Sequence, residues 1–264
     1  MDMEGLIIKN ISNDYVVKSD KGIYSCKARG KFRNMKLTPL VGDYVYVDDN
    51  NLYLLDIKKR KNSLIRPSVA NVDQAIIVSS VKKPDLDTYL LDKLLTIVSF
   101  HEIEPVICFT KLDLLNEEER KEIEEYIQYY QKQGYFVVTN ESKDNFKDLF
   151  QDKITVLTGQ SGAGKSSLLN LLDSSLNLKT DEISMALNRG KHTTRHTELF
   201  EVMDGYIVDT PGFSQVDFHD MTPMDIRDNM KEMFDNLHDC KYRDCLHVKE
   251  DGCAVKKAVS DGVI

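Results

Sequence analysis

The stretch TGQSGAGKSS, residues 158–167, decides what kind of fold this chain has. It matches the pattern GxxxxGK(S/T) in full, between an apolar strand pattern and a helical pattern, and that context defines a phosphate-binding loop. Glycines let backbone N–H groups converge on phosphate oxygens, and the helix N-terminus adds partial positive charge. A glycine-rich turn without a ligand is the alternative. The residues expected to contact nucleotide here are Thr158, Gly159, Gln160, Ser161, Gly162, Ala163, Gly164, Lys165, Ser166 and Ser167.

Three side chains and one backbone N–H, from this loop and from a second motif, carry the phosphate chemistry. Lys165 is expected to reach the β- and γ-phosphates and to act in catalysis, and Ser166 to ligate Mg²⁺. DTPG, residues 209–212, follows the apolar strand GYIV. Its Asp209 would lie near Mg²⁺, and its Gly212 would donate an N–H to the γ-phosphate. Pro-Gly after a strand is common in turns, so DTPG alone is weak evidence for a nucleotide site. It becomes strong evidence because the same chain contains a phosphate-binding loop.

The tetrapeptide Thr110, Lys111, Leu112 and Asp113 ends the apolar strand PVICFT. In GTPases an NKxD motif at such a place selects guanine. Its carboxylate accepts hydrogen bonds from the guanine N1–H and amino group, which adenine cannot supply. Asp113 is present here, whereas Thr110 replaces the asparagine. A helix-capping aspartate is the alternative reading. We expect GTP and GDP to bind. The asparagine of the motif normally supports this site, and Thr110 stands in its place.

The order of these motifs is unusual. The guanine motif (110–113) precedes the phosphate-binding loop (159–166), and DTPG (209–212) comes last. In most GTPases the guanine motif follows the other two, so this sheet begins in what is normally its second half. Such a circular permutation is tolerated because the termini of compact domains often lie close together. Residues 140–142 (Asn-Glu-Ser) stand where a loop touching the guanine oxygen belongs.

The polar, basic segment 187–200 between the loop and DTPG is expected to be a nucleotide-dependent switch. Thr193 or Thr194 is the candidate Mg²⁺ ligand, and we choose Thr194. Phe213 stands where Ras-like enzymes place a glutamine that orients the attacking water, which a phenyl ring cannot do. His192 is the nearest candidate for this catalytic role. A solvated loop histidine is the alternative.

A Cys/His cluster closes the sequence. Cys240, Cys245, His247 and Cys253 form the pattern C-x4-C-x-H-x5-C. Three thiolates and one imidazole make a closed tetrahedral set for one structural Zn²⁺, with no open position for catalysis. Buried free thiols are the alternative. With five cysteines in all and no signal peptide, a disulfide framework is not expected.

Three domains are expected along the chain. Residues 1–66 contain about five short β patterns and suggest an OB-fold barrel. Residues 67–216 alternate strands and helices, which indicates an α/β domain with a parallel sheet. Residues 217–264 are expected to form an α-helical zinc-binding domain. The β patterns are GLIIKNI, DYVVKSD, GIYSCKARG, DYVYVDD and LYLLDIK.

Charge divides along the same boundary. The 264 residues carry a net charge of −8, yet residues 1–66 hold 13 Lys/Arg against 8 Asp/Glu. A basic segment on an acidic chain is a candidate contact for nucleic acid, and a solvated surface is the alternative. Its basic stretches are KARGKFRNMK (27–36) and KKRKNSLIR (58–66). No apolar run approaches the roughly 18–20 residues of a membrane span. A cytoplasmic protein with no membrane partner is expected.

Together these motifs resemble the circularly permuted, ribosome small-subunit-dependent GTPases of the RsgA (YjeQ) family. The resemblance rests on TKLD, GQSGAGKSS, GKHTT (190–194), DTPGF and the Cys/His cluster followed by AVKKAV, and it covers essentially the whole chain. It implies a bacterial enzyme with an N-terminal OB-fold, a permuted GTPase and a zinc domain. Such an enzyme hydrolyses GTP on the 30S subunit late in its maturation. In that family the switch histidine is proposed to help hydrolysis, which supports His192.

The resemblance also sets the expected partners and two departures. The 30S subunit and its 16S rRNA are expected to bind and to stimulate turnover, and the protein is expected to be a monomer. Thr110 departs from the motif asparagine. The sequence ends at DGVI (261–264), where the family typically continues into another helix, and a truncated end is one of two readings that the residues leave open. The alternative function is a nucleotide-controlled RNA-binding module in which hydrolysis is incidental, and an ATPase is a third.

Overall fold

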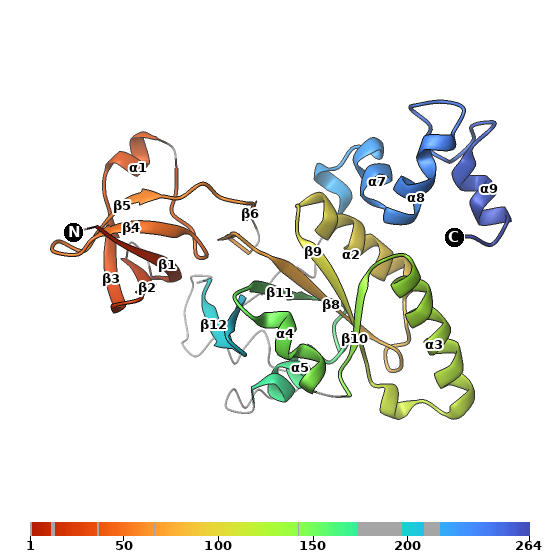
Figure 1. Ribbon diagram of the computed structural model, residues 1–264, viewed down its shortest axis with the longest axis horizontal. Coiled ribbons are helices and arrows are strands. Elements are labelled where there is room, and N and C mark those ends of the chain that lie inside the picture. Colours follow the sequence, from red (N-terminus) through yellow and green to blue (C-terminus); the bar gives the residue numbers. More distant parts are fainter. Residues whose placement is uncertain are drawn as a thin grey trace.

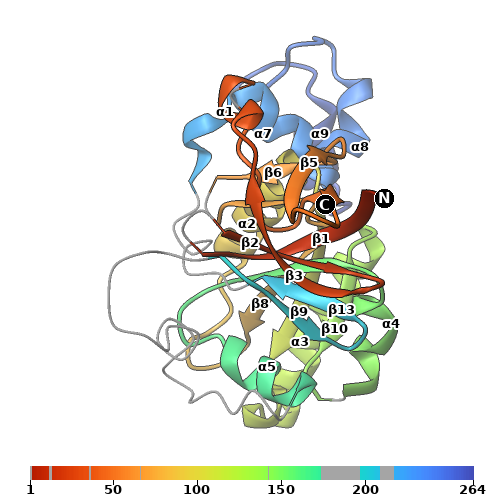
Figure 2. The ribbon, with the colours of Figure 1, turned by 90° about the vertical axis from the view of Figure 1, so that its left-hand side faces the viewer.

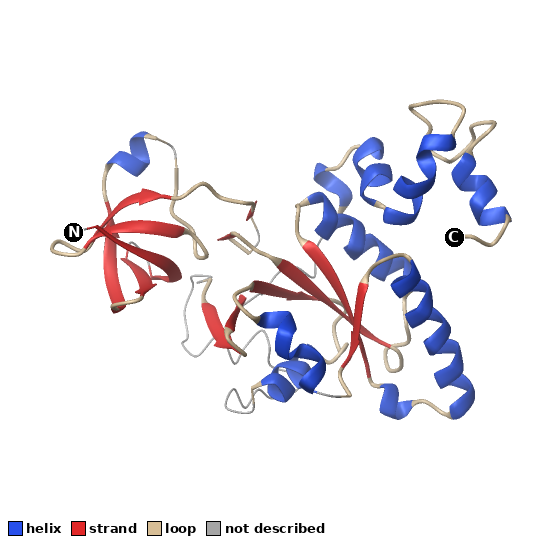
Figure 3. Cartoon of the chain, in the orientation of Figure 1, coloured by secondary structure: helices blue, strands red, loops and turns tan. Residues whose placement is uncertain are grey.

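The computed structural model describes residues 2–11, 14–35, 37–65, 67–141, 143–173, 197–208 and 217–264. Figures 1 and 3 show a small β-barrel at one end, a central sheet with helices on both faces, and a group of short helices at the other end. In the described parts of the chain, no helix has the length and apolar character needed to cross a membrane. The expected order of barrel, α/β sheet and helical segment is confirmed.

The N-terminal barrel closes in the strand order β1-β2-β3-β5-β4. Alternate side chains point inward, and Val17, Val45 and Leu54 are completely buried. A register shift between Ile7 and Lys9 bends β1 so that it can pair with β2 and β4. The expected OB-type barrel is therefore confirmed. Its elements are β1 (Asp2–Ile11), β2 (Asp14–Ser19), β3 (Gly22–Ala28), α1 (Lys31–Asn34), β4 (Tyr44–Asp48) and β5 (Tyr53–Ile57).

A short hairpin, β6 (Ser63–Leu64) with β7 (Val69–Ala70), joins the barrel to the sheet. Gly42 of the barrel lies so close to it that a Cβ there would sit 2.1 Å from the Ala70 carbonyl oxygen. Asn71 donates to the Gly42 carbonyl oxygen at 2.8 Å in a buried contact. The connection is therefore a packed joint.

A buried ion pair holds the other side of this joint. The carboxylate of Asp43 is fully buried, and the Arg60 guanidinium donates to both its oxygens, at 2.7 and 2.8 Å. The same guanidinium donates to the Thr38 carbonyl oxygen at 2.6 Å. Bidentate pairing of this kind satisfies a buried charge and fixes its geometry. The segment that leaves β5 is consequently fixed to the loop that precedes β4.

The central sheet has the order β10-β9-β8-β11-β13-β12, and only β12 runs antiparallel. Parallel strands buried on both faces require continuous apolar runs, and those runs are what the sequence shows. All carboxyl ends of the parallel strands meet at one edge, where ligands bind in open α/β sheets. The strands are β8 (Gln74–Ser80), β9 (Glu104–Thr110), β10 (Phe136–Thr139), β11 (Ile154–Thr158), β12 (Leu199–Val202) and β13 (Gly205–Val208).

Helices cover both faces of this sheet. Ile77 and Phe109 face the core shared with α2 and α3, whereas Val78 and Cys108 face α4 and α5. The strict alternation follows from the pleat of the strands. Asn116 begins α3 with a capping box closed by Glu119. The bounds are α2 (Thr88–Phe100), η1 (Leu112–Leu114), α3 (Glu117–Lys132), η2 (Lys143–Phe146), α4 (Lys147–Phe150) and α5 (Lys165–Leu172).

The C-terminal segment folds as short helices packed beside α2 and α3. Thr222 and Asp225 form a capping box with Pro223 at the first helical position, and a Thr-Pro pair favours such a helix start. The stretch MTPMDIRDNMKEMF (221–234) has the composition of a single helix, but it is divided because Met230 has extended backbone angles. The elements are η5 (Phe218–Asp220), α7 (Pro223–Asn229), α8 (Lys231–Asn236), η6 (Leu237–Asp239) and α9 (Ala254–Ser260).

Candidate nucleotide and metal sites

The phosphate-binding loop leaves β11 and enters α5 at the carboxyl edge of the sheet (Figure 1). Gly159 has a positive φ of 131°, and a Cβ there would meet the Val78 carbonyl oxygen of β8 at 2.1 Å. Gly162 and Gly164 also have positive φ angles, of 78° and 94°. Only glycine adopts these conformations readily. The three glycines of the loop, two of them fixed by the motif, are therefore required by the backbone path itself.

Lys165 folds back over its own loop. Its Nζ donates to the carbonyl oxygens of Gly159 and Gln160, both at 2.8 Å. Burial lowers the pKa of this lysine because removing the ammonium from water disfavours the charged form. An ammonium held by two carbonyl oxygens in a partly dry loop is well placed for an anionic ligand. Ser166, the expected Mg²⁺ ligand, is buried at the first turn of α5.

The guanine motif lies directly against this loop. Thr110 ends β9, and its Oγ1 donates to the Ala163 carbonyl oxygen at 2.6 Å in a buried contact. Lys111 takes a left-handed conformation with φ of 65°, which turns the chain off the strand. Leu112 is buried beneath the turn, whereas Asp113 is exposed. Residues 53 positions apart in the sequence are thus in direct contact.

A loop outside the three nucleotide motifs supports the same site. The Lys111 Nζ donates to the Lys83 carbonyl oxygen, and Pro84 lies beside Gly162, 3.6 Å from where a Cβ would be. Lys82 pairs with both oxygens of Glu119, the capping residue of α3, at 2.7 Å. The only local signal for this loop is Lys-Lys-Pro after the buried strand QAIIVSS, and no motif specifies it.

The remaining predicted nucleotide residues divide into two groups. Residues 140–141 follow β10, where the Asn140 N–H donates to the Phe109 carbonyl oxygen at 3.2 Å and Glu141 pairs with Arg120 at 2.8 Å. The second group lies outside the residues that the structure describes. It comprises Ser142, His192, Thr193, Thr194, Asp209, Gly212 and Phe213.

The four cluster residues at the C-terminal end come together as expected. The ligand atoms of Cys240, Cys245, His247 and Cys253 all lie within 4.8 Å of one another. The His247 Nδ1 lies 3.3 Å from the Cys253 Sγ and 3.7 Å from the Cys240 Sγ. Backbone N–H groups of α9 donate to two of the sulfurs. Three sulfurs and an imidazole nitrogen at these separations can hold a metal ion.

Arg227 connects this cluster to the rest of the C-terminal segment. Its side chain, on α7, is buried, and its Nη1 donates to the carbonyl oxygens of Arg243 and Cys245, at 3.1 and 3.3 Å. Asp228 accepts from the Arg227 Nε at 2.6 Å. The loop that supplies two cluster residues is therefore tied to a helix by charge-assisted hydrogen bonds.

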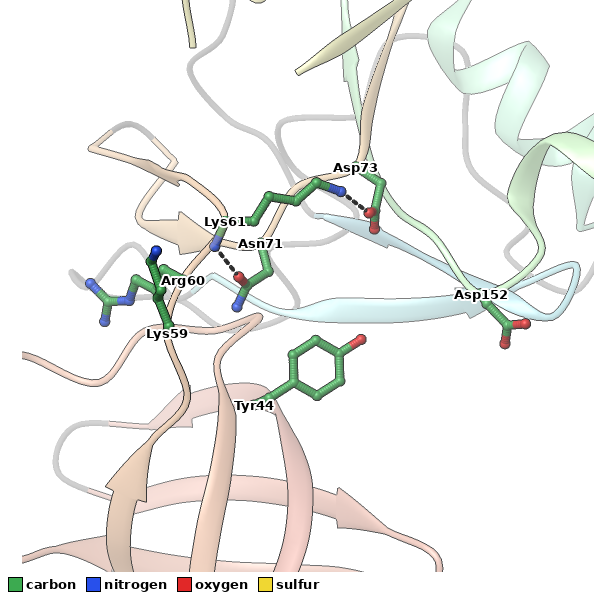
Figure 4. A pocket seen from close by; sticks show the side chains of 7 residues that line it. All are labelled: Tyr44, Lys59, Arg60, Lys61, Asn71, Asp73 and Asp152. Carbon is green, nitrogen blue, oxygen red and sulfur yellow. Dashed lines mark hydrogen bonds and ion pairs between the residues drawn. The ribbon is translucent and has the colours of Figure 1, made fainter. Parts of the chain in front are cut away.

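A cleft of about 520 Å³ lies where the barrel meets the sheet. Figure 4 shows its labelled side chains, among them Tyr44 of the barrel, Lys61 of the joint and Asp73 before β8. Lys61 pairs with Asp73 at 2.5 Å. The basic stretch 58–66 is thus partly used in internal pairs, whereas Lys59 is exposed. Because Asp73 precedes β8, this cleft lies at the amino edge of the sheet, opposite the phosphate-binding loop.

Family models match most of the chain. The model described as RsgA GTPase matches residues 57–219, and the RsgA N-terminal domain matches residues 4–52. The "Small ribosomal subunit biogenesis GTPase RsgA 2" of Oceanobacillus iheyensis is 50% identical over 266 residues, which cover 98% of this chain and 91% of that protein. The RsgA 1 protein of Listeria monocytogenes is 48% identical and matches over 97% of this chain and 90% of its own.

Solved structures agree with these matches. The crystal structure of YloQ, described as a circularly permuted GTPase, has a TM-score of 0.85 and 39% identity, covering all of this chain and 90% of that one. YjeQ from Thermotoga maritima also has a TM-score of 0.85, with 34% identity, covering all of this chain and 93% of that one. Both likenesses extend through the barrel, the sheet and the helical end.

Proposed function

This chain belongs to the RsgA family of circularly permuted GTPases, and from that premise we propose that it hydrolyses GTP to GDP and phosphate during maturation of the small ribosomal subunit. The observation that carries the proposal is the bond from Thr110 to Ala163. It brings a guanine-reading motif and a phosphate-binding loop to one edge of the sheet. A single nucleotide can then be held by its base and by its phosphates.

The residues of the loop have separate roles in this proposal. The backbone N–H groups of residues 159–166 surround the phosphates. Lys165 exchanges its two carbonyl partners for the β- and γ-phosphate oxygens, where its charge stabilises the transition state. Ser166 and Asp209, with Thr194 from the switch, would hold Mg²⁺. The Mg²⁺ ion supplies charge neutralisation to the phosphates when it is bound.

Recognition of the base falls to Asp113, whose carboxylate accepts from the N1–H and amino group of guanine. Lys111, held by the Lys83 carbonyl oxygen, lies next to it in the same turn. His192 is proposed to orient the attacking water. A competition assay of GTP against ATP tests this assignment, because adenine lacks the donors that Asp113 accepts. Equal competition by ATP would contradict it.

We propose that Cys240, Cys245, His247 and Cys253 hold a structural Zn²⁺ ion. The donor set fits zinc, because the imidazole Nδ1 faces the sulfurs and N–H groups of α9 donate to two sulfurs, as thiolates require. Zinc in such a closed set contributes to folding rather than to reaction chemistry. Purified protein should contain roughly one Zn²⁺ per chain.

The proposed partner is the small ribosomal subunit with its 16S rRNA. Support comes from the name of the relatives and from the excess of positive charge on residues 1–66. An OB-type barrel offers a groove that tracks a nucleic-acid backbone. Binding that depends on phosphate contacts should weaken strongly as salt rises. The division at residues 66 and 216 into barrel, GTPase and zinc domains belongs to the same proposal.

The decisive experiment measures GTP turnover with and without added 30S subunits. Turnover should rise strongly with 30S subunits and be lost in Lys165→Ala, which removes the phosphate-binding ammonium. Binding to 30S subunits should also fall between low and high salt. Tight RNA binding in every nucleotide state without stimulated turnover would instead identify a nucleotide-controlled RNA-binding module.

A further inference from the structure

The side chain of Thr110 has one clearly preferred partner. The residue is completely buried at the end of β9. Its Oγ1 donates to the Ala163 carbonyl oxygen at 2.6 Å, while the Ser79 carbonyl oxygen is 3.5 Å away. The distance of 2.6 Å is typical of a well-formed O–H···O hydrogen bond, and 3.5 Å is not. The hydroxyl proton is therefore directed at the phosphate-binding loop.

This bond fixes an amide that phosphate would use. The carbonyl of Ala163 and the N–H of Gly164 belong to one planar trans peptide, so they point in opposite directions. Holding the Ala163 oxygen on Thr110 turns the Gly164 N–H away from β9. Gly164 has φ of 94°, and its missing Cβ would lie 3.6 Å from the Thr110 Oγ1. The guanine motif thus sets the orientation of a phosphate-loop N–H directly.

The same bond limits what Thr110 can do for the base. A threonine hydroxyl has one proton to donate, whereas an asparagine amide has two. Guanine presents acceptors, N7 and O6, on the edge away from the groups that Asp113 reads. Because the Thr110 proton is given to Ala163, none is left for N7. An asparagine at this position could donate one proton to the loop and the other to the base.

We propose that Thr110 is a positioning residue that orients the phosphate-binding loop and makes no hydrogen bond to the purine, so that base selection rests on Asp113. The proposal deepens the GTPase function given above and rests on it. The preference for guanine nucleotides over other purine nucleotides should depend on the guanine N1–H and amino group. Removal of N7 should not change this preference. The substrate class that follows is any nucleotide with the guanine donor edge, including one that lacks N7.

Binding of GDP analogues to the wild-type chain tests, without any mutation, the claim that Thr110 makes no hydrogen bond to the purine. GDP and 7-deaza-GDP, which lacks the N7 acceptor, should bind within about twofold of each other. Inosine diphosphate, which lacks the amino group read by Asp113, should bind more weakly. In Thr110→Asn, one hydrogen bond to N7 should favour GDP over 7-deaza-GDP by about threefold to tenfold. Wild-type discrimination of tenfold against 7-deaza-GDP would overturn the proposal.

Two variants of similar size test the claim that Thr110 orients the phosphate-binding loop. Thr110→Val removes the hydroxyl and should weaken GDP binding about tenfold, since the Ala163 oxygen loses its partner. Its preference for GDP over inosine diphosphate should stay unchanged. Thr110→Ser keeps the hydroxyl and should restore binding. Thermal unfolding without nucleotide shows whether each variant is folded. Wild-type affinity in Thr110→Val would overturn the proposal while leaving GTPase function intact, whereas equal binding of ADP and GDP by wild type would refute the GTPase premise itself.

Discussion

Gly159 shows how closely a single residue of the phosphate-binding loop is constrained. A Cβ at this position would meet the Val78 carbonyl oxygen at 2.1 Å, and the φ of 131° is strained for any other residue. Gly159→Ala should therefore lower the free energy of unfolding by about 3 kcal/mol and weaken GDP binding. Urea unfolding and a GDP titration measure both effects.

Gly30→Ala is the control for that change. Nothing lies within 4 Å of a Cβ at Gly30, and its φ is not positive. This substitution should change the free energy of unfolding by less than about 0.5 kcal/mol. If the two variants unfolded at the same urea concentration, the close approach of Gly159 to β8 would not limit the loop.

A second prediction about a single residue concerns His192 and the rate of GTP hydrolysis. If His192 orients the attacking water, His192→Ala should spare GTP binding and slow hydrolysis about ten- to a thousand-fold. His196→Ala is the matched control, because it removes a histidine four positions along the sequence to which no role is assigned. Single-turnover hydrolysis with 30S subunits is the measurement. Near-normal turnover in His192→Ala would reject the assignment.

Among the elements, buried strands and capped helices were predictable from local sequence. Continuous apolar runs predict β8, β9 and β11, and the Thr222-Pro223 pair predicts the start of α7. The joint β6–β7 was not predicted, because two-residue strands have no periodicity to detect. The split between α7 and α8 at Met230 was also missed, since both sides have helical composition. These details depend on contacts between distant residues.

The interface between α2 and α8 carries a pH prediction. The Tyr130 hydroxyl donates to the Asp92 carboxylate at 2.8 Å, and Glu232 of α8 faces the same region. Burial raises the pKa of Asp92 to about 6, from an ordinary 3.8, with Glu232 adding to the rise. Burial raises the pKa of Glu232 as well. In this window the folded chain binds more protons than the unfolded chain, so stability falls as pH rises from about 4 to 6.

Asp92→Asn tests the sign of that effect. The amide oxygen can still accept from Tyr130, while the cost of a buried charge is removed. The variant should be more stable than wild type at pH 8, and its advantage should vanish by pH 4. Urea midpoints across this range are the measurement, with exposed Asp85→Asn as the control. A lower midpoint for Asp92→Asn at pH 8 would contradict the prediction.

The proposed zinc site makes a prediction about the C-terminal elements. Cys245→Ser removes one of four ligands and should abolish stoichiometric zinc and destabilise the segment containing α7 to α9. GDP binding should persist, because the phosphate-binding loop belongs to the central sheet. Cys108→Ala, which alters a buried thiol of β9, should keep its zinc. Zinc content by atomic absorption distinguishes the outcomes, and metal-free folded wild type would refute the site.

At the scale of the whole molecule, the order of domains was predictable and their contacts were not. The sequence of TKLD, phosphate-binding loop and DTPG predicts the permutation, because each motif stands at the end of a recognisable strand. The placement of the barrel against β12 depends on pairs such as Lys9 with Glu198, which are 189 positions apart in the printed sequence. Figure 2 shows the barrel strands in front of β12 and β13.

Two ion pairs at this contact carry the last prediction. Lys9 pairs with Glu198 and Lys18 with Glu201, both at 2.7 Å. Each of these partly exposed pairs contributes only ~0.2–1 kcal/mol to stability. Changing both lysines to glutamate should place like charges together and therefore increase hydrogen exchange in β12. Combining these changes with Glu198→Lys and Glu201→Lys should restore protection.

The control for the charge reversal lies within the barrel. Lys58→Glu disrupts the pair of Lys58 with Glu4, in which both partners belong to the N-terminal residues. This variant should leave hydrogen exchange in β12 unchanged. If the charge-swapped chain remained as unprotected as the lysine-to-glutamate chain, the ion pairs would not hold the barrel to the sheet.

The ion pair of Arg60 with the buried Asp43, together with the packed hairpin after it, holds the two ends of the molecule at a fixed spacing. The barrel and the zinc-cluster end are both anchored to one sheet, through this joint and through contacts such as Lys231 with the Gly134 carbonyl oxygen. Their spacing is set when the chain folds, so docking costs little further orientational freedom. A surface that offers two attachment points at that spacing gains both grips at once, and a surface with any other spacing gains one. If both ends contact the small ribosomal subunit, as proposed above, this joint would make binding depend on the distance between the two contact points.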